Sequence, residues 1–282
     1  MTAAGAIRSM RRRSSGHSAL IAGVLFLAVI LALFATGRLD ARRWQPFLDL
    51  STWRFLGEGL LLTLFVGFVS LVLSLMLGIP VGIARFSLRG PLKLILAAAV
   101  ELVRATPILA IVFITLIAMN RLVPGIDPVW PGIVGLSMYN IAVIGEIVRA
   151  GIASIPSGQV EAARSLGLGY LPTMRAVVLP QALAQMTPAL VSQLITLIKD
   201  TTLLFIISAS ELVSHGRSLF VFYGNVLETW IVIACIFFAI NYPLSRFSRR
   251  LETRRPADER LHIIGEEDQT LVPAITMSHP KA

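Results

Sequence analysis

The sequence predicts an all-α integral membrane protein, a helical bundle of about six transmembrane helices. Apolar residues make up 55% of the 282 residues and charged residues only 15%. The mean hydropathy is +0.77, and the apolar residues lie in long blocks. Because a soluble protein of this length would expose far more polar surface, these observations exclude an ordinary soluble domain.

Six apolar blocks approach or exceed the roughly 20 residues that cross a hydrocarbon layer of about 30 Å as a helix. The first block is short, and Pro131, Asn140 and Glu146 interrupt the fourth. We therefore expect spans at residues 20–34, 59–84, 94–119, 129–148, 188–208 and 227–245.

The first block has a second interpretation. A basic stretch ending in Arg11-Arg12-Arg13 before a modest apolar run is also the outline of a secretory signal. No clean small-residue cleavage site follows Leu33-Phe34-Ala35. We expect a retained anchor helix, and either outcome leaves the topology of the later spans unchanged.

The distribution of lysine and arginine predicts the orientation of the spans. With both termini inside, 17 of the 25 basic residues lie on the inner side and 6 in the outer segments. This bias satisfies the positive-inside rule, although the first outer loop alone holds four arginines. The pI near 10.7 does not indicate nucleic-acid binding, because the basic residues flank spans and suit anionic lipid headgroups.

The inner segment between the fourth and fifth spans has the signals of two short helices. Gly158 is an acceptable helix cap, and Glu161 would then lie in the first turn, near free backbone N–H groups and the positive dipole end. Residues 161–166 are predicted as a short helix. Gly167 can take the left-handed conformation that closes it, and Pro172 suits the first turn of the next helix.

The same segment is basic and smooth, with Arg164 and Arg175 beside Ala162 and Ala163, so we expect it to seat in a groove on another protein. Over residues 154–182 it closely resembles the signature loop of permease subunits of ATP-binding-cassette (ABC) importers. That family docks the loop onto a separate ATPase. The matching residues, which the resemblance assigns to ATPase coupling, are Glu161, Ala162, Ala163, Gly167, Leu179 and Pro180.

Three further runs extend the resemblance to the polar amino-acid type of these permeases. They are ELVRATP at 101–107, YNIAVIGEIVRAG at 139–151 and KDTTL at 199–203. Pro107 lacks a backbone donor and should kink the third span. The resemblance covers about residues 55–250, so we expect a permease domain of five helices there. Residues 1–54 then hold a basic tail, the anchor helix and an outer loop, and residues 251–282 form a mobile inner tail.

The resemblance also suggests a substrate. The pair YN at 139–140 and the run VSQL at 191–194 look most like glutamate permeases of high-GC Gram-positive bacteria, so glutamate or aspartate is expected. Val143, Gly145 and Ala110-Ile111 depart from residues common in the family. Another polar amino acid, such as glutamine or a basic amino acid, therefore stays open.

Polar residues inside the predicted spans are the candidates for a pathway, because an ionisable side chain in the bilayer is costly unless it faces protein or water. Glu101 and Arg104 share a helical face and can pair. Lys199 and Asp200 point about 100° apart, so at least one should meet another helix or the pathway. The candidate pathway or gating residues are Glu101, Arg104, Asn140, Gln193, Lys199 and Asp200. A purely structural network is the alternative.

The resemblance implies a transport subunit in a bacterial cytoplasmic membrane. No phosphate-binding loop occurs in the sequence, so a partner must bind ATP. The implied partners are ABC ATPase subunits, a second permease subunit, an extracytoplasmic binding protein, the amino-acid substrate and membrane lipids. We expect no enzyme activity, cofactor or metal site, because the four histidines are scattered and Cys235 is the only cysteine. An ion-coupled secondary transporter is the main alternative, although it would not explain the signature loop.

Overall fold

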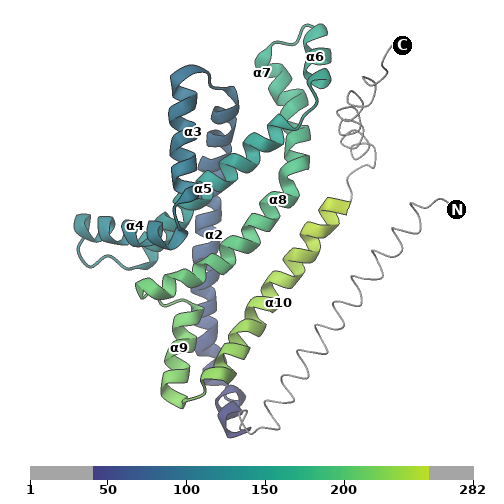
Figure 1. Cartoon of the computed structure of the whole chain (residues 1–282). Coiled ribbons are helices and arrows are strands. Elements are labelled where there is room, and N and C mark those ends of the chain that lie inside the picture. The colour runs from purple at the N-terminus through teal and green to yellow at the C-terminus, as the bar shows by residue number, and fades with distance from the viewer. Residues whose placement is uncertain (1–40, 254–282) are drawn as a thin grey trace, which may run out of the picture. The chain divides into compact units, whose positions relative to one another are not determined.

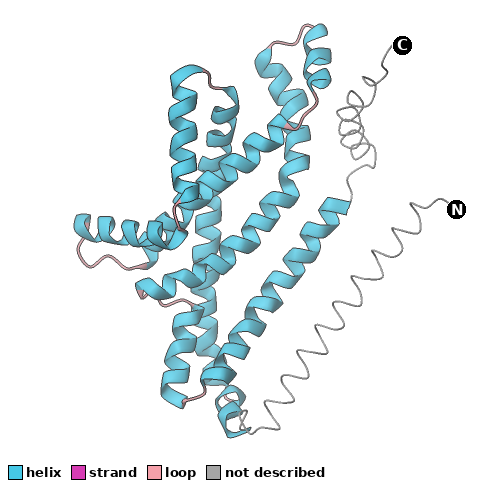
Figure 2. Ribbon diagram, in the orientation of Figure 1, coloured by secondary structure: helices cyan, strands magenta, loops and turns pink. Residues whose placement is uncertain are grey.

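The computed structural model describes residues 41–253, and Figure 2 shows helices joined by short loops throughout this range, without a strand. The expected first span at 20–34 and most of the tail after residue 250 lie outside it. The elements, labelled in Figure 1, are η1 (Ala41–Leu48), α2 (Leu50–Ser87), α3 (Gly90–Ala105), α4 (Ile108–Leu122), α5 (Val129–Ala153), α6 (Ser157–Ser165), α7 (Tyr170–Thr173), η2 (Met174–Val178), α8 (Leu179–Asp200), η3 (Thr201–Ile207), α9 (Leu212–Tyr223) and α10 (Val226–Thr253).

Four helical runs in this range are long and apolar enough to cross a membrane, and a bent helix pair could be a fifth span. The helical membrane fold is therefore confirmed, and α2, α5 and α10 contain the expected spans. The expected span at 188–208 belongs to a longer run, Tyr170–Ile207, which is continued through a π-helical turn at Met174–Val178. Pro131 does not interrupt the fourth span, because it lies in the first turn of α5.

The expected span at 94–119 is a bent helix pair and not one continuous helix. The chain breaks between α3 and α4, and the two helices are bent by 102° (Figure 1). The reason is local, since Pro107 has no N–H to continue the helix. Thr106 closes α3 with its N–H on the Leu102 carbonyl at 3.1 Å, and its hydroxyl donates to the same carbonyl at 2.7 Å.

The chain divides into two compact units, which are described separately. The smaller unit joins residues 41–60 with 212–235. It contains α9, which replaces the expected outer loop around Arg217. Leu212, Gly216 and Leu219 are buried on one face of α9, a helical period that a search for full-length spans passes over. Asn225, the residue before α10, donates a hydrogen bond from Nδ2 to the Arg43 carbonyl oxygen at 3.2 Å.

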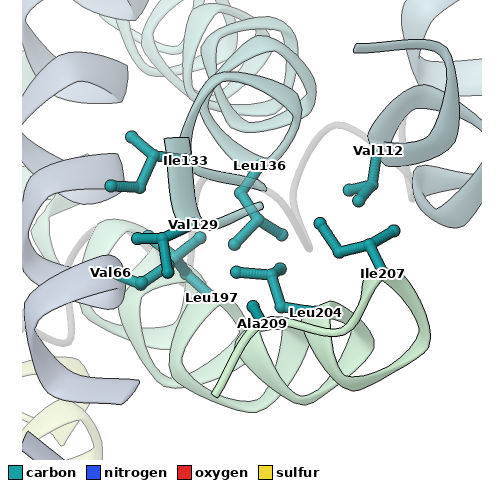
Figure 3. Close-up of a cluster of buried hydrophobic side chains, with 9 residues drawn as sticks. All are labelled: Val66, Val112, Val129, Ile133, Leu136, Leu197, Leu204, Ile207 and Ala209. Atoms are coloured by element: carbon teal, nitrogen blue, oxygen red, sulfur yellow. The ribbon is translucent and has the colours of Figure 1, made fainter. Parts of the chain in front are cut away.

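The larger unit joins residues 61–211 with 236–253 and is built around α5. In α5, 61% of the most apolar window is buried, against at most 33% in the other three spanning runs. Two apolar clusters cover its two ends. Figure 3 shows the first, formed by Val66, Val112, Val129, Ile133, Leu136, Leu197, Leu204, Ile207 and Ala209. The second contains Ile144, Val148, Ile152, Ile155, Met174, Val178, Ala182 and Met186.

Small residues every four positions let α2 cross α5 closely. Ser70 and Ser74 are fully buried, and the Ser74 hydroxyl lies 3.4 Å from the Ser137 carbonyl. A Cβ on Gly78 would meet the Ile144 side chain at 2.9 Å, and one on Gly82 would meet the Gly145 carbonyl at 2.5 Å. Only glycine fits at these two positions, so backbone contact sets the distance between α2 and α5.

Gly82→Ala should therefore destabilise the protein although alanine favours helices. The added methyl must displace the α5 backbone, and overpacking of this kind costs about 1–3 kcal/mol. Gly67→Ala is the matched control in the same helix, because its Cβ would meet only ordinary contacts at 3.7 Å and beyond. Thermal unfolding in detergent should show a lower midpoint for Gly82→Ala alone. Equal midpoints for the two variants would contradict the close crossing.

Candidate functional site

The segment at 154–182, called the elbow from here on, forms two short helices as expected, but the first begins earlier. Helix α6 starts at Ser157 after the N-cap Pro156. Gly158 is thus a helical residue and not the cap, and Glu161 lies beyond the first turn. Proline explains the difference, since its fixed φ and missing N–H suit a helix start.

Gly167 closes α6 as predicted. Its φ is +81°, and its N–H donates to the Arg164 carbonyl at 2.9 Å while the Leu168 N–H donates to the Ala163 carbonyl at 3.2 Å. These two bonds form a Schellman motif, which satisfies the last carbonyls of the helix. Any side chain at position 167 would strain this turn. Pro172 lies in the first turn of α7, again as expected.

The elbow is packed onto α5 and α8 through one buried side. Ala163, Thr173 and Met174 are each less than a tenth exposed, and Met174 and Val178 belong to the cluster that covers the end of α5. Ala163 is therefore buried within the elbow, where its small size serves packing, whereas Ala162 is exposed. The second short helix runs without a break through η2 into α8, where Leu179 is half-buried and Pro180 exposed.

The other side of the elbow is exposed with respect to the described residues 41–253. Glu161, Ala162 and Arg164 are exposed on α6, and Leu166 and Leu171 are 83% and 65% exposed. Exposed leucines beside small and charged residues indicate a surface that another protein covers. The structure thus leaves Glu161 and Ala162 available for a partner and places Gly167 at the turn that orients them.

A charged cluster that the sequence did not single out joins α2 to α5. Glu146 forms ion pairs with Arg85 of α2 and with Arg149, one helical turn further along α5. Arg149 Nη2 lies 2.6 Å and Nε 3.0 Å from Glu146 Oε1. We call these three residues the clasp. The sequence showed Glu146 only as an interruption of a span, and its spacing of three from Arg149 was the available signal.

A hydrogen bond ties the end of α2 to the elbow as well. Ser87 Oγ and Tyr170 Oη are 2.8 Å apart, across 83 residues of sequence. Ser154 is the first residue after α5, and its hydroxyl donates a hydrogen bond to the side-chain oxygen of Gln185 in α8. The clasp and these contacts gather the end of α2, the end of α5 and the start of α8 around the elbow.

Two of the six expected pathway residues meet inside the larger unit. Gln193 Nε2 donates to Asn140 Oδ1 at 2.7 Å, and Asn140 Nδ2 donates to the Leu136 carbonyl at 2.8 Å. Asn140 is fully buried. The pair links α5 to α8 by side-chain amides at mid-helix, a place where a polar group needs a partner.

The other four candidates are not part of this amide pair, and they are more exposed than Asn140. Glu101 and Arg104 pair as expected, at 3.2 Å, but their side chains are 66% and 37% exposed. Lys199 is exposed and Asp200 half-buried. In the part of the chain that is described, neither side chain forms a hydrogen bond or ion pair, so the prediction that one of them meets another helix stays a prediction. No group of three or more possible metal ligands occurs among residues 41–253.

Comparison with known proteins gives consistent matches. Residues 74–255 match the family described as "Binding-protein-dependent transport system inner membrane component". A protein of Bacillus subtilis named "Probable glutamine ABC transporter permease protein GlnP" is 38% identical over 71% of this chain and 94% of its own. The "Glutamate transport system permease protein GluD" of Corynebacterium glutamicum is 36% identical over 83% of this chain and 88% of its own.

A solved structure agrees with these matches. It is described as an amino acid ABC transporter with histidines, and it superposes with a TM-score of 0.67 at 28% identity. The superposition covers 72% of this chain and 94% of that chain. The family match over residues 74–255 includes the elbow, the clasp and the amide pair.

Removing the charge at the centre of the clasp should destabilise the protein. In Glu146→Gln two arginines lose the carboxylate that they share, and the Glu146 side chain is only 22% exposed. The free energy of unfolding should fall by about 1–3 kcal/mol. Glu101→Gln removes the same kind of i,i+3 pair at the surface, where such pairs contribute about 0–1 kcal/mol. Thermal unfolding in detergent compares the two variants. Equal shifts of the unfolding midpoint would show that the clasp contributes no more stability than the exposed pair.

Proposed function

The chain belongs to the family of inner membrane components of binding-protein-dependent transport systems, and from this premise we propose that it is the permease subunit of an ATP-driven importer of polar amino acids. Membership confirms the resemblance seen in the sequence motifs. The observation that carries the proposal is the elbow, with one side packed on the inner ends of α5 and α8 and the other side free.

In this proposal, ABC ATPase subunits bind the free side of the elbow at the cytoplasmic face. ATP binding brings two elbows together and opens the outer side, and hydrolysis lets them part. Only a difference in contact between the elbow and the two ATPase states can shift this equilibrium. Val160, Met174 and Val178 pass a displacement of α6 to α5 and α8, because close-packed interiors transmit strain.

Residues 55–250 constitute the permease domain in this proposal, with residues 1–54 as an inner tail, anchor helix and outer loop and residues 251–282 as an inner tail. A second permease subunit, identical or related, completes the pathway. An extracytoplasmic binding protein delivers the substrate, and both termini are cytoplasmic. Anionic lipids surround the basic inner ends of the spans.

Glutamate or aspartate is the proposed substrate. Gln193, held by its hydrogen bond to the buried Asn140, is half-buried, and its amide supplies a further donor and an acceptor that suit the carboxylate and amino groups of an amino acid. Glutamine is the second candidate, favoured by the 38% identity to the Bacillus relative named for it. The amide chemistry of the pair is compatible with both side chains.

Competition uptake tests the proposal as a whole. The permease would be reconstituted in vesicles with its ATPase and binding protein, and labelled glutamate uptake measured against aspartate, glutamine and arginine. ATP-dependent uptake that glutamate and aspartate suppress most strongly is expected. Uptake that persists without the ATPase, driven by an ion gradient, would favour a secondary transporter instead.

Gly167→Val should separate coupling from folding of the membrane helices. A β-branched residue at φ +81° costs about 1–2 kcal/mol locally and distorts the turn after α6. Uptake and co-purification with the ATPase should fall, while the amount in the membrane stays normal. Gly158→Ala is the control, because its Cβ meets nothing within 4 Å. Normal uptake by Gly167→Val would count against the docking role.

Gln193→Leu should change substrate handling without loosening the ATPase. It removes the donor to Asn140 Oδ1, and losing one hydrogen bond to a charged substrate group raises the KM for uptake about tenfold. Thr196→Val, also on α8 but exposed, serves as the control. If both variants keep the parent KM and selectivity, the amide pair is a structural contact and not part of the pathway.

A further inference from the structure

A pocket of about 470 Å³ lies between the end of α2, the start of α3 and the elbow. This volume is within the range of about 300–1,000 Å³ that is typical of small-molecule sites. Its apolar wall includes Phe86, Ile152, Val160, Met174 and Val178. The pocket is distinct from the amide pair, and it shares Glu161 and Arg164, but not Ala162, with the exposed side of α6.

The polar side of the pocket favours an anion. Arg89, the residue before α3, and Arg164 of α6 both line it, against one carboxylate, Glu161. Ser157, the first residue of α6, also lines it, and no side chain caps the N–H groups of that helix start. Hydroxyls of Ser87, Tyr170 and Thr173 complete the rim. Arginine forks and free helix N–H groups are the donors that phosphate oxygens prefer.

The surroundings of the pocket point to a lipid as the source of the anion. Helix α3 begins immediately after Arg89, and its Leu92, Leu94 and Ile95 are 63%, 72% and 65% exposed. Exposed apolar side chains of this kind suit hydrocarbon, so the arginine at the helix end lies at headgroup depth. A phospholipid can place its phosphate at Arg89 and its acyl chain along the exposed apolar side chains of α3, whereas a free anion would contact only the polar residues.

We propose that this pocket binds the phosphate headgroup of an anionic phospholipid of the inner leaflet, with Arg89 and Arg164 as its ligands. The inference rests on the proposed cytoplasmic position of the elbow. The bound lipid holds α6 against the end of α2 from the membrane side, next to the hydrogen bond between Ser87 and Tyr170. Anionic lipid thereby keeps the elbow in the arrangement that the ATPase recognises.

The test uses the complete transporter, with its ATPase and binding protein, in nanodiscs of phosphatidylcholine alone or with added phosphatidylglycerol. Native mass spectrometry measures the lipid retained by the complex, and substrate-stimulated ATP hydrolysis measures coupling. Phosphatidylglycerol should be retained and should raise coupled hydrolysis. Arg89→Gln should lower its retention about fivefold, the effect of one arginine at an anionic headgroup, and should remove the stimulation. Lys93→Gln is the control, since Lys93 is exposed on α3 outside the pocket.

The possible results separate the lipid pocket from the proposed function. Equal lipid retention by Arg89→Gln and the parent, or an equal loss in Lys93→Gln, overturns the pocket while leaving the transporter intact. Inorganic phosphate that replaces phosphatidylglycerol in stimulating hydrolysis overturns the lipid in favour of a free anion. Absence of substrate-stimulated hydrolysis in every lipid, or outside labelling of the elbow, refutes the proposed function itself.

Discussion

The close crossing of α2 and α5 is the constraint on which the rest of the structure depends. Ser70, Ser74, Gly78 and Gly82 bring the two backbones into contact, and this contact fixes where the end of α2 lies. Arg85 consequently reaches Glu146, and Ser87 reaches Tyr170 on the elbow. In a bilayer, lipid competes with apolar side chains for the helix surface, so packing of small residues is an effective way to hold helices together.

This crossing makes α5 the element that links the elbow to the centre of the larger unit. Its last turns share an apolar cluster with η2 and α8 and carry the clasp residues Glu146 and Arg149, and Asn140 lies at the middle of the same helix. A displacement of α6 must be absorbed by this packed set of helices, because cores change between discrete arrangements and do not deform continuously. Helix α5 thus connects the elbow to the amide pair through direct packing.

Sequence reasoning predicted the helical membrane fold, the two elbow helices and the Gly167 turn, because apolar length and a left-handed glycine are local signals. The predicted start of α6 was wrong, because the N-cap is Pro156 and Gly158 lies within the helix. The sharp bend at Pro107 was foreseen only as a kink, because the angle depends on what α4 packs against. The contact of Glu146 with Arg85 joins residues 61 positions apart, and no pattern in a single sequence indicates such pairing. The buried side of Ala163 was missed for the same reason.

The central claim is that the free side of the elbow is held by an ATP-hydrolysing partner and moves with it. Cross-linking from Ala162→Cys, in a Cys235→Ser background within native membranes, tests this most directly. The account predicts that the thiol introduced at position 162 captures the ATPase, with a yield that differs between the nucleotide-free and ATP-bound states. Labelling of this thiol by an impermeant reagent from outside the cell, or a failure to capture any ATPase in either state, would contradict it.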